Sequence, residues 1–188
     1  MRQASRQLLT LLDTYVCGDD AECASVAHAR QMITQHADIW LQSCKEGHVT
    51  GSGLILDPED KKVLLLHHRK LQLWLQMGGH GEDEFDPSRT ALREAFEESG
   101  LTGLAFFPNP AQPTLIDVDA HIIPARDEQP EHYHLDFRYL FSTSSPEEVQ
   151  LARAEAKDIR WFAFSEIAAL SLKPATLRLL RKAEKLIK

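Results

Sequence analysis

Apolar residues in the first quarter of the chain recur at helical spacing, so this part of the chain is expected to be α-helical. A first helix is indicated by Leu8, Leu9, Leu11, Leu12 and Tyr15, and a second, longer helix after the sequence CGDD by Val26, Ile33, Trp40 and Leu41. The stretch contains no proline, the residue that most disrupts a helix interior. We therefore predict an N-terminal helical extension at residues 1–46, packed on a main domain at residues 47–188.

From residue 48 onward the pattern changes to short apolar runs and to alternating polar and apolar positions, both of which are typical of β-strands. Strands are predicted at HVTGSGLIL, KVLLLHH, LWLQMGG, LTGLAFFP, PTLIDVDAHIIPA, EHYHLDFRYLFST and DIRWFAF. Closing helices are predicted at SEIAAL and PATLRLLRKAEKLI. Strands and helices mixed in this order predict an α/β or α+β sandwich.

One more helix is predicted between these strands, at residues 87–99. Asp86 is a good N-cap, Pro87 stands at the first helical position, and Gly100 can adopt the left-handed conformation that ends a helix. The arc that we expect to face the core is formed by Leu92, Ala95, Phe96 and Ser99.

Three carboxylates occupy the opposite side of this helix, because Glu94, Glu97 and Glu98 have the spacing i, i+3, i+4. Like-charge pairs at these spacings each cost roughly 0.2–0.5 kcal/mol, and the helix dipole disfavours anions in the last turn. The cluster is either a solvated acidic face or a site for a hard cation such as Mg²⁺ or Mn²⁺, which prefers oxygen ligands. The spacing alone leaves both interpretations open.

Composition limits the partners of such a site. Apolar residues make up 43% of the 188 residues and charged residues 26%, as in soluble globular domains. The formal net charge of −7 argues against nucleic-acid binding, which needs a basic surface. Cys17, Cys23 and Cys44 form no C-x-x-C motif, so we expect neither a structural disulfide nor a zinc site and predict a cytoplasmic protein. Asp13 interrupts the leucine-rich start, so no signal peptide is expected, and no apolar run is long enough to span a membrane.

The glycines before the acidic helix extend the pattern. Gly78 and Gly79 end a predicted strand, and 13 residues separate Gly79 from the segment REAFEESGL at residues 93–101. This arrangement resembles the signature of the Nudix family, G-x5-E-x7-R-E-U-x-E-E-x-G-U, where U is a bulky apolar residue and Ala95 stands at the first U. The first glutamate of the signature falls on Phe85. Its acidic neighbours are Glu82, Asp83, Glu84 and Asp86, and which of them replaces it stays open.

The resemblance covers roughly residues 47–175 and implies a Nudix-type α/β/α sandwich with a mixed β-sheet. It also implies a hydrolase that cleaves the phosphoanhydride bond of a nucleoside diphosphate derivative with metal-activated water. The family's metal ligands correspond here to the Gly79 carbonyl group and to Glu94, Glu97 and Glu98, which would hold Mg²⁺ or Mn²⁺.

Two further roles follow from the same resemblance. Arg93 is expected to pair with a glutamate and orient it rather than touch the substrate. The general base that deprotonates the water is either Glu98 or Glu155, which lies just before the DIRWF strand.

Two predicted strands carry polar residues along one side, namely His132, His134, Asp136 and Arg138 on one strand and Asp117, Asp119 and His121 on the other. They form either ordinary exposed faces or the wall of a polar pocket that contacts substrate or metal. We take His121, His134 and Arg138 as candidate substrate-binding residues. To these we add His80, which lies beside the proposed metals, and Arg69 in the HHRK turn, which could grip a phosphate.

The residues argue against two alternatives to a hydrolase. A non-catalytic Nudix-fold nucleotide-binding or regulatory module has no need for a costly carboxylate cluster. An isoprenoid-diphosphate isomerase of similar fold is expected to carry an active-site cysteine, whereas all three cysteines here precede the main domain. The expected partner is a small molecule rather than nucleic acid or a membrane. The helical extension could cover the pocket or build a homodimer, and the sequence does not identify the substrate.

Overall fold

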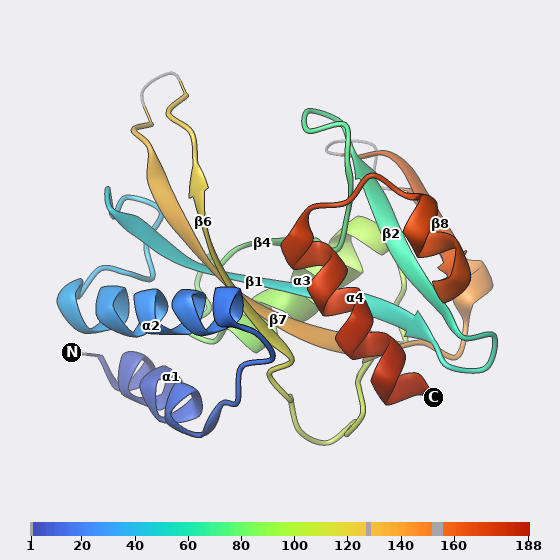
Figure 1. Cartoon of the computed structure of the whole chain (residues 1–188), viewed down its shortest axis with the longest axis horizontal. Coiled ribbons are helices and arrows are strands. Elements are labelled where there is room, and N and C mark those ends of the chain that lie inside the picture. Colours follow the sequence, from blue (N-terminus) through green and yellow to red (C-terminus); the bar gives the residue numbers. More distant parts are fainter. Residues whose placement is uncertain (1, 127–128, 152–155) are drawn as a thin grey trace.

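The computed structural model of the chain describes residues 2–126, 129–151 and 156–188. Within these residues a sheet of eight strands forms the centre of the molecule (Figure 1). The strands are β1 (Gly47–Asp57), β2 (Lys62–His68), β3 (Trp74–Leu75), β4 (Met77–His80), β5 (Ala105–Phe106), β6 (Asp117–Ile123), β7 (His132–Ser142) and β8 (Ala156–Ala163). The helices are α1 (Gln3–Thr14), α2 (Asp20–Gln35), α3 (Pro87–Ser99) and α4 (Pro174–Ile187), with 3₁₀ helices η1 (Pro146–Glu148) and η2 (Phe164–Ala169). None of these helices has the length and apolar character needed to cross a membrane.

The sheet is mixed because its two central strands are parallel while their other neighbours are antiparallel. β1 pairs with β7 in parallel register from Gly47↔Tyr133 to Leu56↔Ser142. Antiparallel pairing adds β2, β3, β4 and β8 on the side of β1, and β5 and β6 on the side of β7. The predicted α/β fold with a mixed sheet is confirmed.

Helices cover both faces of this sheet (Figure 1). α3 approaches β1 so closely that a Cβ atom on Gly51 would collide with the backbone of Pro87, so only glycine fits there. On the other face, Leu179 of α4 is buried in one apolar cluster with Leu54 of β1. The layers are therefore those of the α/β/α sandwich that the family resemblance implies.

The N-terminal extension consists of two helices, which lie beside β6 and β7 at one end of the molecule (Figure 1). Leu12 of α1 and Ile33 of α2 belong to the same buried apolar cluster as residues of the sheet. The second helix is shorter than predicted, because it ends at Gln35 and Trp40 lies in the turns beyond it. The Trp40 ring is buried and its N–H donates to Ser5 Oγ (2.9 Å). Trp40 therefore anchors the turns after α2 and is not part of the helix.

Three other segments differ from the prediction in extent or environment. LTGLAFFP forms a strand only at Ala105–Phe106, and SEIAAL lies in 3₁₀ rather than α-helix. Phe96 of α3 is 48% exposed instead of facing the core, because the buried arc of the helix is made by small residues such as Ala91 and Ala95. By contrast, α3 has the predicted bounds, with Asp86 as its N-cap.

Cys17 and Cys23 form a disulfide across the turn between α1 and α2. The prediction that the chain has no disulfide is therefore wrong. The spacing of the two cysteines did not show the bridge, because the start of α2 brings Cys23 back toward Cys17, with 5.4 Å between the Cα atoms, a separation that suits a disulfide. Because two cysteines are bonded, the cysteines do not indicate a reducing compartment.

A buried ion pair fastens the extension to the rest of the molecule. Glu22 of α2, whose side chain is fully buried, pairs with Lys182 of α4 and accepts hydrogen bonds from the Tyr15 hydroxyl and from the Val118 backbone N–H. Burial alone would raise the pKa of the Glu22 carboxyl, but the Gly18 amide, Lys182 and Tyr15 together lower it to about 2. Charge therefore ties α2 to both α4 and β6.

Replacing Glu22 with glutamine is expected to lower the free energy of unfolding by about 3 kcal/mol at neutral pH, because the change removes one partner of a buried ion pair. A carboxyl with a depressed pKa stabilises the fold above its unfolded value of 4.5, and this contribution is lost as the pH falls toward 2. The gap between wild type and variant should therefore shrink in acid. Urea denaturation at a series of pH values measures the gap, with the exposed Glu148→Gln as control; a gap that does not change with pH would contradict the assignment.

Candidate active site

The acidic helix α3 and the glycines of β4 are in direct contact. Gly79 lies so close to Glu94 that a Cβ atom at position 79 would overlap the carboxylate unless the Glu94 side chain moved. One residue earlier, the backbone N–H of Gly78 donates a hydrogen bond to Glu98 Oε2 (2.8 Å). Glu97 lies further round the helix, and half of its side chain is exposed. Two of the three predicted carboxylates thus meet the backbone of β4.

Arg93 joins these carboxylates to the strand through its guanidinium group. Its Nη1 lies 3.0 Å from Glu94 Oε1 and 2.9 Å from Glu97 Oε2, and its Nη2 donates to the His80 carbonyl oxygen (2.6 Å). Its Nε donates to Glu84 Oε1 (3.0 Å). Burial alone would lower the pKa of Arg93, but the acidic partners raise it above its ordinary value. Arg93 therefore pairs with glutamates as a charged, planar donor.

Glu84 supplies the carboxylate that the sequence lacks at position 85. Its side chain is 22% exposed and reaches Arg93 from the loop before α3. Burial alone would raise the pKa of the Glu84 carboxyl, but the hydrogen bond from Arg93 and the Glu82 amide lower it. Phe85 turns instead toward the N-terminal extension, where its ring meets Trp40 edge-on with 6.0 Å between centroids. The deviation from the family signature is thus a shift of one residue.

The donor atoms around Gly79 suit a hard divalent cation. Glu94, Glu97 and Glu98 offer carboxylate oxygens, and the backbone carbonyl group of Gly79 would complete a set made only of oxygen, the ligand type that Mg²⁺ and Mn²⁺ prefer. Neighbouring side-chain and backbone donors already hold two of the carboxylates, so little side-chain freedom would be lost on binding. The residues present therefore fit the predicted cation.

The polar side chains of β6 and β7 share one face of the sheet, as the alternation predicts. The register pairs Asp117 with Arg138, Asp119 with Asp136, and His121 with His134. This face is not an ordinary exposed surface, because Asp117 is completely buried and Asp136 is 5% exposed. The interpretation as two solvated strand faces is therefore wrong.

Arg138 is the centre of a buried ion network on this face. Its Nε, Nη1 and Nη2 atoms lie 2.7 Å, 3.2 Å and 3.0 Å from carboxylate oxygens of Asp136, Asp117 and Asp119, respectively. Arg178 of α4 donates two hydrogen bonds to Asp117. Because the Arg138 side chain is only 4% exposed and each of its nitrogens has a carboxylate partner, the geometry does not support its predicted contact with substrate. It links β6 to β7, and Arg178 joins α4 to the same carboxylates.

The predicted histidines lie together on the same side of the sheet. His80 Nε2 is 3.2 Å from His134 Nε2, and the ring centroids of His121 and His134 are 5.7 Å apart. Arg69 is not part of this group: it lies at the exposed end of β2 and donates to the Ala156 carbonyl oxygen (3.1 Å). The structure therefore brings three of the predicted substrate-binding residues together.

His48 of β1 belongs to this group, although the sequence analysis does not single it out. Its ring centroid is 4.9 Å from that of His80 and 4.8 Å from that of His134. Burial and the neighbouring imidazoles lower the pKa of His48 to about 4 and the pKa of His134 to about 2. The signal for His48 is the parallel pairing of β1 with β7, which places it opposite His134. Glu155, the alternative general base, lies outside the described residues.

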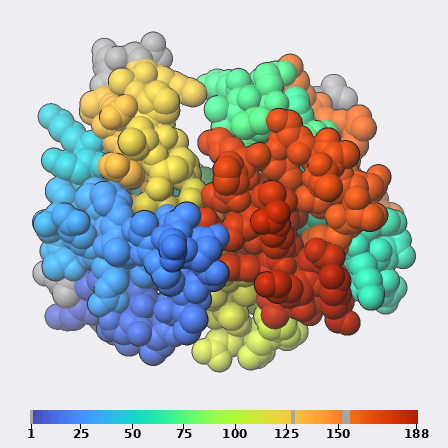
Figure 2. All heavy atoms as spheres, in the orientation of Figure 1, coloured from blue at the N-terminus to red at the C-terminus, as the bar shows by residue number. Residues whose placement is uncertain are grey.

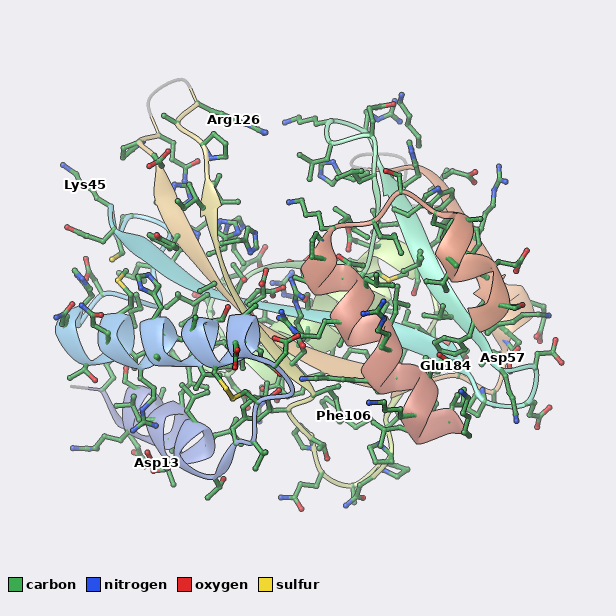
Figure 3. The ribbon with its side chains drawn as sticks, in the orientation of Figure 1. Asp13, Lys45, Asp57, Phe106, Arg126 and Glu184 are labelled. Atoms are coloured by element: carbon green, nitrogen blue, oxygen red, sulfur yellow. A yellow bond between two sulfur atoms is a disulfide. The ribbon has the colours of Figure 1, made fainter. Side chains whose placement is uncertain are left out.

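A hollow gives access to the sheet between the two ends of the molecule. Figure 2 shows it between the β6 segment, coloured yellow, and the green and red segments that include the turn after β2 and α4. In Figure 3, Arg126 extends from the end of β6 on this side of the molecule.

The mixed sheet between two helical layers, with a carboxylate-bearing helix held against a pair of glycines, defines the class of Nudix domains. The model of the family described as NUDIX domain matches residues 47–183, so the chain belongs to the Nudix family.

Relatives of this chain carry the same fold. The chain is 36% identical over 91 residues to the "Probable DHNTP pyrophosphohydrolase" of Lactococcus lactis subsp. cremoris (strain MG1363); the match covers 47% of this chain and 51% of the relative, so the chain spans about half the length of this curated relative. A NUDIX-family hydrolase from Clostridium perfringens is similar with a TM-score of 0.53 and 22% identity over 75% of this chain and 98% of that one. The NUDIX domain of Shewanella oneidensis NrtR, solved with ADP ribose, is similar with a TM-score of 0.54 and 17% identity over 84% and 97%.

Proposed function

We propose that the chain is a Nudix pyrophosphohydrolase, which cleaves a phosphoanhydride bond in a small nucleoside diphosphate derivative and uses Mg²⁺ or Mn²⁺. The observation that carries this proposal is the contact between α3 and β4, which holds Glu94 and Glu98 against Gly79 and Gly78. The names of the relatives support the reaction class. The net charge of −7 favours a small molecule over nucleic acid.

The residues of α3 would hold the cation and keep its ligands in place. When bound, the cation supplies charge neutralisation of the diphosphate and lowers the pKa of a bound water. Glu94, Glu97, Glu98 and the Gly79 carbonyl group are the proposed ligands. Arg93 keeps two of these carboxylates at fixed spacing, so they need not reorganise as charge develops during bond cleavage.

Glu98 is the proposed general base for the attacking water. A general base must be held within hydrogen-bond reach of the proton that it removes. The hydrogen bond from the Gly78 N–H to Glu98 Oε2 (2.8 Å) fixes this carboxylate beside the glycines and the proposed cation ligands. Glu155 remains the alternative base.

A product-release screen with Mg²⁺ or Mn²⁺ tests the proposal. The panel contains nucleotide sugars and nucleoside triphosphates, together with ADP ribose and DHNTP, which the names of the relatives suggest. We expect the wild type to hydrolyse at least one compound in a cation-dependent reaction, releasing pyrophosphate from a triphosphate or a nucleoside monophosphate and a sugar phosphate from a nucleotide sugar or ADP ribose, and Glu98→Gln to be strongly impaired. Absence of turnover on every compound, or equal turnover by the variant, would refute the hydrolase. Tight binding of a compound without turnover would instead favour the nucleotide-binding module.

Glu84→Gln is expected to lower kcat/KM of this reaction about 10–100-fold, the range typical of losing a residue that orients a metal ligand. The variant keeps the size of the side chain but weakens the hold on Arg93. Exposed Glu82→Gln is the matched control and should change kcat/KM by no more than about twofold. Steady-state kinetics at saturating Mg²⁺ distinguish the two, and equal values for both variants would show that Glu84 does not position the site.

A further inference from the structure

Three histidines from three strands converge on the side of the sheet opposite α3: His48 of β1, His80 of β4 and His134 of β7. One ring nitrogen of each histidine lies within 4.8 Å of a ring nitrogen of each of the other two. The three side chains meet because successive side chains of a strand point to opposite faces of the sheet. His134 is the register partner of His48, and His80 is the partner of Thr50, two residues further along β1. Because Gly79 faces Glu94, the next side chain, His80, points to the other face.

The spacing of the nitrogens suits ligands of one metal ion. Two nitrogens bound to a tetrahedral ion at about 2.1 Å are roughly 3.4 Å apart. His80 Nε2 and His134 Nε2 are 3.2 Å apart. This distance also fits a hydrogen bond between the two rings, so the pair alone does not decide between a shared proton and a shared ion.

His48 provides the independent observation. It is 1% exposed, and neither of its ring nitrogens has a partner of good hydrogen-bond geometry among the described residues, although the Cys44 backbone lies near enough to interact with the ring. Buried imidazole nitrogens are ordinarily hydrogen-bonded, so a buried ring without partners needs an explanation. An ion shared with His80 and His134 would satisfy the His48 nitrogen that faces them.

Other side chains would enclose such an ion without binding it. The His132 ring stacks on His48 with 5.0 Å between centroids, and its Nδ1 bonds the Pro130 carbonyl oxygen (2.8 Å). His121 lies beside His134, and its Nδ1 is 3.0 Å from Asp119 Oδ2. Both rings are thus held in place by their own partners beside the proposed ligands.

We propose that His48, His80 and His134 form a binding site for a divalent transition-metal ion, of which Zn²⁺ suits the donors best. Imidazole nitrogens favour Zn²⁺ and its neighbours, whereas Mg²⁺ prefers oxygen, so this site would be chemically distinct from the one on α3. Three histidine ligands leave the fourth tetrahedral position for water or a ligand atom. The missing C-x-x-C motif made a cysteine zinc site unexpected, but a site made of histidines needs no cysteine.

Zinc binding by the full chain tests the proposal directly. Equilibrium dialysis with metal analysis is expected to find Zn²⁺ bound to the wild type and affinity reduced by more than about 100-fold in His48→Ala and His134→Gln, since loss of an outer partner alone costs about 10–100-fold. His67→Ala is the matched control, because His67 packs on Trp74 outside the group, and it should bind as the wild type does. Co²⁺ in place of Zn²⁺ should give the visible absorption of a tetrahedral complex, and this absorption should be lost in His134→Gln.

Two further variants separate this site from the other possible sites. Glu94→Gln should weaken Mg²⁺ binding but leave Zn²⁺ affinity unchanged. Cys44→Ser should also leave it unchanged, although His36, Asp38 and Cys44 form another group with ligand atoms within 4.8 Å of one another. Anomalous scattering at the zinc edge should give a peak between the three rings.

The proposal is overturned if the wild type binds no Zn²⁺, if His134→Gln binds it with unchanged affinity, or if the anomalous peak lies only at α3 or at Cys44. His134 is partly exposed and glutamine keeps its polarity, so this variant remains informative even if His48→Ala does not fold. None of these measurements depends on hydrolysis, so failure of the proposed activity would leave the zinc result interpretable.

Discussion

Replacing Glu98 with glutamine is expected to lower kcat for hydrolysis of a nucleoside diphosphate derivative by at least about 10³-fold, because a general base alone contributes about 10²–10⁴-fold and a cation ligand is lost as well. Glutamine has the same size and can still accept the hydrogen bond from the Gly78 N–H. The change therefore removes charge and basicity but little packing. Steady-state rates at the Mg²⁺ concentration that saturates the wild type, with thermal unfolding measured in parallel, provide the test.

The comparison with Glu59→Gln makes the Glu98 result specific. Glu59 is exposed in the turn between β1 and β2, so its loss removes one negative charge far from the proposed cation and should leave kcat unchanged. If a higher Mg²⁺ concentration restores the full rate of Glu98→Gln, then Glu98 is only a cation ligand and Glu155 becomes the candidate base. A kcat near that of the wild type at ordinary Mg²⁺ concentration would contradict both roles.

Replacing Arg138 with methionine is expected to destabilise the fold by about 3–5 kcal/mol, because it leaves buried carboxylates without their cation. Asp136 is the most affected, since Arg138 lies 2.7 Å from it, whereas Asp119, 3.0 Å from Arg138, keeps Arg178 at 3.6 Å. Asp117 retains Arg178 and Lys182 as partners. Methionine fills most of the space of the arginine stem, so the loss reports charge rather than a cavity. Denaturation in urea measures it.

Arg160→Met is the matched control for this network. Arg160 also pairs with an aspartate, Asp158, but its side chain is 64% exposed, and exposed pairs contribute at most about 1 kcal/mol. A second substitution, Asp136→Asn, should recover part of the stability lost in Arg138→Met, because it removes a carboxylate that has no cation. Equal losses for Arg138→Met and Arg160→Met would show that the buried network contributes no more than a surface pair.

The bounds of α3 could be predicted accurately because the signals that set them are local. For α3, the N-cap Asp86, the Pro87 start and the Gly100 stop lie within the helix or beside it, and the spacing of Glu94 and Glu98 already predicts a shared face. That Glu94 and Glu98 contact Gly78 and Gly79 could be predicted only from the family resemblance. This contact depends on how β4 pairs with β1, which no local pattern specifies.

Several features of the site could not be predicted because they depend on contacts between distant segments. The alternation of β7 shows that His134 and Arg138 share a face. It does not show that Arg178 of α4 binds a carboxylate partner of Arg138, or that His134 meets His48 of β1. Counting residues along the signature places Phe85 at the glutamate position, but only the bend of the loop shows that Glu84 reaches Arg93. Long-range pairing decided both outcomes.

The contact of Phe85 with the N-terminal extension joins the loop before α3 to the two leading helices. The Phe85 ring lies against Trp40 and beneath the Arg2 guanidinium, so the position that the family signature gives to a glutamate contacts the N-terminal extension in this chain. Homologues that lack the two leading helices should therefore keep a glutamate at this position. Homologues that have the helices are expected to carry the carboxylate one residue earlier, as Glu84 does here, and a residue that contacts the helices at the position of Phe85.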